Sequence, residues 1–318
     1  MRPEFHIRPF APGDEAPIDR LLDDLWGHDP AMLAVSRIHK DWGPATGLLR
    51  TTLVAAHGGT VIGAGTLFES TLHPAHLLAG INVAGGWQRR GAGSQVYAEL
   101  RRLSPARPWM ARLSLRDQAG VRFAGQRGFR RLANTLSGTL SPDRPETRRW
   151  IEALPPPPDG CAIRGIDGAA GDPAPLELAR LHAALYAQSH QWSPPAPKSD
   201  GQALRQFCGE AVLAGSQLAA YARGQLVGAA NLIAHPHKPA SADAYLVNVG
   251  VLDGAGPLAG QLCGALIRRS LEWAAARGLR VEVEADDSSA LVRGWLELAP
   301  FSSVDRDFVI VAALPPEP

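Results

Sequence analysis

Hydrophobic and polar positions along the chain follow an order of elements that occurs twice. Residues 5–26 predict a short strand, a turn and an amphipathic helix, and residues 161–186 repeat that order. Residues 52–70 predict a β-hairpin with glycine at its turn, and residues 218–236 predict a second hairpin of the same kind. The first part of each half therefore follows one plan.

The elements predicted in the second part of each half also occur in the same order. Apolar strands within residues 77–86 and 245–254 run into glycine, and a helical pattern follows each of them. Another strand, a helical stretch and a final strand close each half, with the final strands expected within residues 128–140 and 300–314. A repeat of this length indicates a duplicated domain, because solenoid repeats are only about 20–50 residues long.

A proline-rich segment, residues 141–160, separates the two halves. Its run of four prolines favours an extended polyproline conformation, and a short helix is expected around Trp150. We therefore expect an N-terminal domain at residues 1–140, a linker at 141–160 and a C-terminal domain at 161–318. Each domain is predicted to be an α/β sandwich, with a mixed central sheet flanked by helices, and is long enough to bury its own core.

Composition excludes several protein classes. Apolar residues make up 45% of the chain, and no stretch approaches the roughly 20 consecutive apolar residues that a membrane span requires. The N-terminus lacks the apolar region of a secretory signal, and the three scattered cysteines form neither a metal-binding spacing nor a disulfide framework. These features predict a cytoplasmic protein with no metal and no membrane association.

Charge is unevenly divided between the halves. Residues 1–150 contain 20 Lys and Arg against 13 Asp and Glu, whereas residues 151–318 contain 12 against 18. Eleven arginines lie between Arg89 and Arg131, which suits a small anionic ligand or a solvated basic face. Nucleic acid is not expected as a partner, because neither a basic patch with interleaved aromatic residues nor a recognition helix stands out.

A glycine-rich turn joins a strand and a helix in the first half. The strand ends at Val83, Gln88 follows five residues later, and Gly91 and Gly93 precede a helix that starts near Ser94. Glycines allow the main chain to approach an anion closely, and the N–H groups from about Arg89 to Ser94 can then point at its oxygens. The helix dipole and two arginines add positive charge. The turn therefore predicts a phosphate-binding site.

The order of elements and this turn resemble the GCN5-related N-acetyltransferase (GNAT) family. The resemblance covers nearly the whole chain as two tandem acyl-CoA N-acyltransferase-like domains, and it implies that the anion is the pyrophosphate of acetyl-coenzyme A. Gly128-Phe129 matches a family pair. Asp117 stands where the family often has Asn, and Ala124 where many members have a tyrosine that protonates the departing thiolate. The implied coenzyme-binding residues are Val83, Ala84, Gln88, Arg89, Arg90, Gly91, Ala92, Gly93, Ser94 and Asp117.

The second copy departs from this pattern. If either Val249 or Val251 is matched to Val83, the first Gln or Arg of the motif is missing, and one of the two registers puts Pro257 at a glycine position. Proline has no N–H to offer a phosphate. We therefore expect the C-terminal copy to have lost productive coenzyme binding and to support the first copy.

Acetyl transfer to an amine requires a group that removes the proton of the amine. The N-terminal copy offers His76 and Glu69 as weak candidates for this base, since both precede the central strand. A backbone N–H near Val83 or Ala84 can stabilise the oxyanion. Asn82 and Tyr97 can contact substrate, although such residues more often satisfy core partners.

The loop at residues 182–197 is rich in aromatic and histidine residues. Tyr186, His190 and Trp192 can either line an acceptor pocket between the copies or pack on the linker. The loop around Trp42 occupies the corresponding place in the first copy.

Three functions fit these features. The leading hypothesis is an acetyl-CoA-dependent N-acetyltransferase, in which a primary amine of a small molecule attacks the thioester directly in a ternary complex. The alternative is a catalytically silent acyl-CoA-binding protein that acts as a sensor or scaffold. A generic nucleotide-binding α/β protein is disfavoured, because no dinucleotide or P-loop pattern is present. A monomer and a homodimer are equally compatible with the sequence, and the acceptor stays open.

Overall fold

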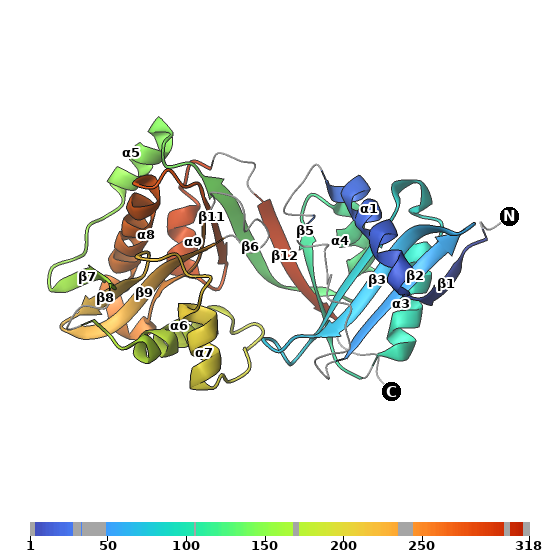
Figure 1. Cartoon of the computed structure of the whole chain (residues 1–318), viewed down its shortest axis with the longest axis horizontal. Coiled ribbons are helices and arrows are strands. Elements are labelled where there is room, and N and C mark those ends of the chain that lie inside the picture. The colour runs from blue at the N-terminus through green and yellow to red at the C-terminus, as the bar shows by residue number, and fades with distance from the viewer. Residues whose placement is uncertain are drawn as a thin grey trace. The chain divides into compact units, whose positions relative to one another are not determined.

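The computed structural model describes residues 4–27, 33, 49–104, 106–167, 172–234, 244–301 and 306–313. It divides the chain into two compact units. Unit 1 comprises residues 1–132 and 309–318, and unit 2 comprises residues 133–308. Each unit contains one copy of the repeated plan, a sheet with helices against it (Figure 1).

The sheet of unit 1 is antiparallel from its first to its fourth strand, after which β4 and β5 run parallel. Its order is β1 (His6–Pro9), β2 (Arg50–His57), β3 (Thr60–Glu69), β4 (Leu77–Val83), β5 (Trp109–Ser114) and β12 (Arg306–Ala313). Its helices are η1 (Pro12–Asp14), α1 (Glu15–Trp26), η2 (Gly85–Trp87), α3 (Ala92–Leu103) and α4 (Gln118–Gly125).

Unit 2 repeats this arrangement. Its sheet has the order β6 (Arg130–Leu140), β11 (Val281–Asp286), β10 (Ala244–Val251), β9 (Gln225–Ala234), β8 (Leu218–Ala222) and β7 (Cys161–Gly165). Its helices are α5 (Pro145–Ala153), α6 (Pro175–Ser189), α7 (Asp200–Cys208), η3 (Asp253–Leu258), α8 (Ala259–Ala275) and α9 (Ala290–Leu296). The strands β10 and β11 are parallel, as β4 and β5 are in unit 1.

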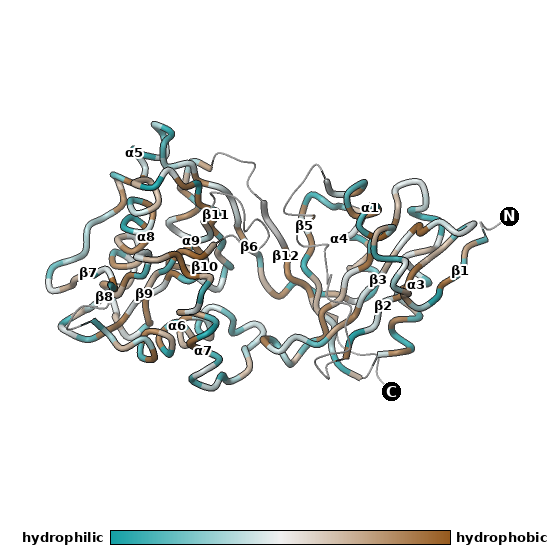
Figure 2. The backbone as a smooth tube through the Cα atoms, viewed as in Figure 1, coloured by the Kyte–Doolittle hydropathy of each residue, from teal (hydrophilic) through white to brown (hydrophobic). Residues whose placement is uncertain are grey.

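Apolar periodicity explains why helices cover both faces of the unit 1 sheet. Leu53 and Ala55 of β2 join the core beneath α3, whereas Val54 between them joins the core beneath α1. Successive strand residues point to opposite faces, so an unbroken apolar strand requires two covering layers. In the hydropathy view, hydrophobic colour follows the strands of both units (Figure 2).

The division into units differs from the boundaries expected from the sequence. Most of β6 belongs to unit 2, where it pairs antiparallel with β11 and buries Leu136 and Leu140 in that core. The end of β12 belongs to unit 1, where Val309 and Val311 pack on Ala124. Each unit therefore takes its closing strand from the other half of the sequence.

The linker residues pack within unit 2. The short helix expected around Trp150 is present as α5, and Ile151 and Leu154 are buried in the core beside α8. The carbonyl of Leu154 accepts a hydrogen bond from Arg268 of α8 (3.0 Å).

Gly138 of β6 leaves the space that the ring of Phe301 occupies. A Cβ atom at this position would lie 2.5 Å from Cδ1 of Phe301, so we expect Gly138→Ala to destabilise unit 2 by about 1–3 kcal/mol through overpacking. Gly165→Ala is the matched control, because nothing lies within 4 Å of a Cβ atom there. Urea denaturation of both variants measures the difference, and equal stability of the two would contradict the close packing described.

Candidate functional site

In unit 1, the parallel strands β4 and β5 pair only at their first residues. Their register consists of Leu77 opposite Trp109 and Leu78 opposite Met110. The amide of Leu77 donates to Pro108 on the β5 side (2.9 Å), and the amide of Ala84 donates to Ile62 on the β3 side (2.9 Å). Because backbone direction alternates along a strand, Ile81 and Val83 present their backbone groups on the side where β5 no longer pairs.

A tight turn connects the end of β4 to α3. Arg89 has a φ of 60° and Gly91 a φ of 96°, and α3 begins at Ala92. The side chain of Gln88 reaches back and donates to the carbonyl of Val83 (3.2 Å). A φ of 96° lies outside the region that L-residues adopt readily, so the conformation of this turn depends on glycine.

The turn presents a row of six amides. The amide of Gln88 donates to Ala84 and that of Gln95 donates to Gly91, but the amides of residues 89–94 have no hydrogen-bond acceptor among the residues that the structure describes. Ala92 is buried, and a Cβ atom built at Gly93 would lie 3.4 Å from the side chains of Val83 and Phe123, so packing fixes one side of the turn. We call these residues, Arg89 to Ser94, the amide cradle. A turn with alternating backbone conformations at the N-terminus of a helix is suited to binding an anion.

Arginine side chains surround the amide cradle. Arg89 and Arg90 are exposed, and Arg90 lies over the ring of Trp87 at 5.4 Å. Arg127 donates to Oγ of Ser94 (2.7 Å) and to the carbonyl of Phe123 (3.0 Å). Arg127 was missed in the sequence analysis. The signal for it was only its place in the arginine-rich stretch, which does not distinguish it from its neighbours.

Asp117 and Tyr97 have structural partners near the cradle. Asp117 caps α4 by accepting a hydrogen bond from the amide of Gly120 (2.9 Å). The ring of Tyr97 packs edge-on against Trp109, with a centroid distance of 5.3 Å, and Arg127 lies over it at 5.1 Å. The capping role of Asp117 accounts for its carboxylate without a coenzyme contact.

Ala124 lies where the resemblance leads one to look for a tyrosine. It is buried against Val309 and Val311 of β12. No phenol is therefore present at this position of α4.

The two candidate bases lie at the other end of β4. Glu69 pairs with Leu77, and His76 directly precedes that strand. Six residue steps separate Leu77 from Val83, which places the bases about 20 Å along the strand from the amide cradle. A pantetheine arm separates the diphosphate of coenzyme A from its thioester, so some separation between the base and the cradle is required.

The two candidates differ in how they are held. Glu69 accepts from the amide of Leu49 (2.8 Å) and forms an ion pair with Arg107, and these contacts lower the pKa of its carboxyl group. His76 is half-buried, and burial, followed by the charges of His73 and Arg107, lowers its pKa. The imidazole of His76 is consequently neutral at pH 7, the form that accepts a proton.

Two further residues at the end of β4, Asn82 and Ala84, already form hydrogen bonds within unit 1. Asn82 accepts a hydrogen bond from the indole of Trp26 at the end of α1 (3.0 Å). The amide of Ala84 is used by Ile62. The amide of Val83 lies six residue steps along β4 from Leu77, so it is too far from His76 to act as oxyanion donor for a reaction in which His76 is the base.

The corresponding turn of unit 2 is built differently. Gly228 pairs with Val251 as Gly63 pairs with Val83, so the structure selects the register that matches Val251 to Val83. Pro257 lies in this turn, within η3, and lacks an N–H. Three amides of this turn already have acceptors. The amide of Ala255 donates to the carbonyl of Leu252 and that of Ala259 to the carbonyl of Gly256, while the amide of Asp253 donates to the side chain of Gln188.

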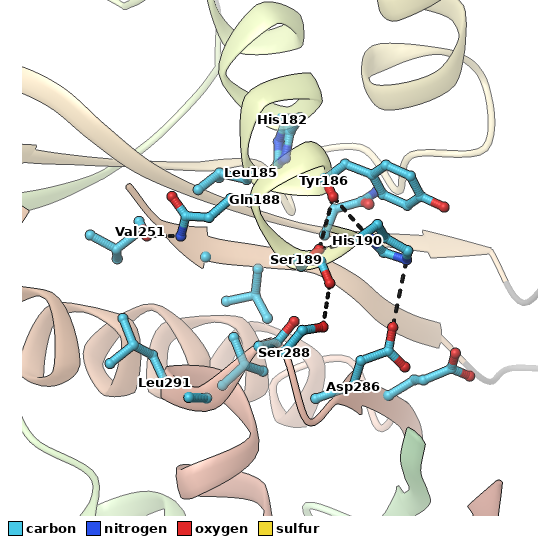
Figure 3. Close-up of a pocket in the computed structure, with 18 of the residues that line it drawn as sticks. His182, Leu185, Tyr186, Gln188, Ser189, His190, Val251, Asp286, Ser288 and Leu291 are labelled. Carbon is cyan, nitrogen blue, oxygen red and sulfur yellow. Dashed lines mark hydrogen bonds and ion pairs between the residues drawn. The ribbon is translucent and has the colours of Figure 1, made fainter. Parts of the chain in front are cut away.

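Unit 2 contains a cavity of about 440 Å³ between the end of α6, the strands β10 and β11, and the start of α9 (Figure 3). Tyr186 and His190 line it, and all its described lining residues belong to unit 2, whereas the sequence led us to expect a pocket between the copies or packing on the linker. Trp192 does not line it, but its ring lies 5.4 Å from that of His190. The loop around Trp42 lies outside the described residues.

Hydrogen bonds fix the imidazole of His190. Its Nδ1 lies 2.9 Å from the carbonyl of Tyr186 and 2.8 Å from Oγ of Ser189, and its Nε2 lies 3.7 Å from Asp286. The rings of Tyr186 and His190 stack at 3.8 Å. Figure 3 shows His190, directly after the end of α6, pointing toward Asp286.

Within the described part of the chain, no helix is both long and apolar enough to span a bilayer. Nor do three or more His, Cys, Asp or Glu side chains gather there as a metal-binding group.

Comparison with known proteins is informative at the level of structure. No protein-family model and no curated protein matches the sequence. A GCN5-related N-acetyltransferase from Sphaerobacter thermophilus is similar, with a TM-score of 0.66 and 16% identity over 99% of this chain and 97% of that one. A tandem GNAT protein from the clavulanic acid biosynthesis pathway is similar, with a TM-score of 0.60 and 19% identity over 99% and 100% of the two chains. The chain has the tandem fold of the GCN5-related N-acetyltransferases.

Proposed function

We propose that the protein is an acetyl-CoA-dependent N-acetyltransferase that acts on a primary amine of a small molecule and binds the coenzyme in unit 1. The amide cradle is the observation that carries this proposal. Six consecutive amides without acceptors, among the described residues, are costly unless an anion or water satisfies them, and three arginines lie beside them.

The cradle fits a diphosphate. Nothing lies within 4 Å of a Cβ atom built at Gly91, so the outer side of the turn is open to a ligand. Arg89, Arg90 and Arg127 supply charge for phosphate oxygens. Acetyl-CoA, once bound, supplies a thioester whose carbonyl carbon is the electrophile. The backbone groups of Ile81 and Val83, on the side where β5 no longer pairs, can hold the arm that carries it.

His76 is the better candidate for the base. A free alkylamine has a pKa near about 10, so a base must take its proton before attack, and the neutral imidazole of His76 can do so. Glu69 already accepts from Leu49 and Arg107, and its lowered pKa makes it the weaker base.

The proposal is tested by following thiol release from acetyl-CoA with a panel of small primary amines. We expect turnover with at least one amine, and His76→Ala is expected to lower kcat by about tenfold, since water can replace part of the proton transfer. The lowered pKa of His76 predicts that the acid limb of the wild-type pH–rate profile lies below the ordinary histidine value of about 6.5.

Glu69→Gln is the control for local disruption. It keeps an oxygen for the amide of Leu49, and is expected to change kcat less than His76→Ala does. Binding of acetyl-CoA without turnover of any amine would favour the silent protein, and absence of binding would refute the proposal.

A further inference from the structure

Among the described residues, those that line the cavity of unit 2 carry charge of one sign. The charged ones are Asp253, Glu284 and Asp286, and no described Lys or Arg belongs to the lining. Glu284 and Asp286 alternate along β11 and so project from the same face of the sheet. A concave site lined by one sign of charge concentrates ions of the opposite sign.

Hydrogen bonds hold the two β11 carboxylates in place. Glu284 accepts from the hydroxyl of Tyr245 (2.8 Å), and Asp286 accepts from that of Thr135 (2.5 Å). The two carboxylates act on Tyr186 on the opposite wall. The pKa of Tyr186 is raised, first by burial and then by the charges of Asp286 and Glu284. The carboxylates are therefore fixed and face the aromatic wall.

The histidines of the cavity do not offset this charge. Burial lowers the pKa of His182 to about 4, and burial also lowers that of His190, so both are neutral at pH 7.

His182 adds an unsatisfied polar atom to the wall of the cavity. It lines the cavity and is only 2% exposed, and its Nε2 has no hydrogen-bond partner among the residues that the structure describes. A buried polar atom in this state is uncommon and costs free energy unless something satisfies it.

The remaining wall combines apolar and aromatic side chains with uncharged polar ones. Its apolar and aromatic residues include Leu185, Tyr186, Phe207, Val249, Val251 and Leu291. A volume of about 440 Å³ is at the lower end of the range for small-molecule sites. The adjoining turn contains Pro257, which has no N–H, and Asp253, whose negative charge disfavours a phosphate.

We propose that unit 2 is a binding site for a small organic amine that has no carboxylate and no phosphate. Its ammonium group binds beside Glu284 and Asp286, and its apolar or aromatic body lies against Tyr186. This site is separate from the coenzyme site of unit 1 and does not depend on acetyl transfer.

Calorimetry with matched pairs of amines and amino acids tests the site on the full chain. Tyramine is compared with tyrosine and cadaverine with lysine, because each pair differs only in the carboxylate. We expect at least one amine to bind no less than tenfold more tightly than its amino acid. Equal affinity within both pairs, or no binding of any of the four, would overturn the proposal.

A charge-neutralising variant locates the binding. Glu284→Gln keeps an acceptor for Tyr245 and is expected to weaken amine binding about tenfold, whereas Glu282→Gln, on the same strand but outside the lining, leaves it unchanged. Acetyl-CoA binding should be the same in both variants. Amine affinity that is unaffected by Glu284→Gln, or that Glu282→Gln lowers equally, would assign the amine to another place.

Discussion

Gly91→Ala weakens acetyl-CoA binding by at least a hundredfold, about 2.7 kcal/mol, if the amide cradle holds the diphosphate. Gly91 has a φ of 96°, a conformation that an L-residue avoids, so alanine there forces the turn to change. The amides of residues 89–94 then no longer converge. Loss of two charge-assisted hydrogen bonds, each contributing about 1.5–3 kcal/mol, is sufficient for this effect.

Gly58→Ala is the control for this substitution. Gly58 also has a positive φ, of 54°, and also has open space around a built Cβ atom, but it lies in the β2–β3 hairpin. Both variants test backbone strain in unit 1, and only Gly91→Ala should impair binding in calorimetry. Unchanged affinity in Gly91→Ala would place the coenzyme away from the cradle and would remove the main support for the proposed function.

His182 makes the stability of unit 2 depend on pH. Burial lowers its pKa in the folded protein to about 4, from the ordinary value of 6.5. Because the folded value is the lower one, its contribution is complete above pH 6.5 and is lost as the pH falls toward 4. This difference between the folded and unfolded pKa values of His182 corresponds to about 3 kcal/mol of unfolding free energy.

His182→Phe removes this dependence. The ring of His182 already stacks on Phe207, with a centroid distance of 5.8 Å, so an aromatic replacement preserves the packing. Urea denaturation between pH 4 and 7 should show a steeper loss of stability in the wild type than in His182→Phe. His6→Phe, which replaces an exposed histidine of unit 1, should retain the wild-type slope. Equal slopes in His182→Phe and the wild type would show that His182 is not the group responsible.

The amide cradle could be read from the sequence because a turn is a local structure. Val83 ends its strand, as expected, and the turn follows at the expected glycines, although the positive φ of Gly91 and the hydrogen bond from Gln88 to Val83 are known only from the structure. The duplicated α/β plan was also readable, since apolar periodicity identifies strands and helices and their order repeats. The structural comparisons confirm the tandem GNAT fold.

Contacts between distant segments were decided only by the tertiary structure. The pattern of β6 and β12 predicts strands, but a period of two does not say which sheet edge each strand joins. Arg127 reaches Ser94 only because α4 packs beside α3, and the acidic cavity exists because α6 brings His182 and Tyr186 to Glu284 of β11. Local residue preferences fix the conformation of a turn, whereas a pocket depends on which surfaces are buried together, and that choice is made by the whole fold.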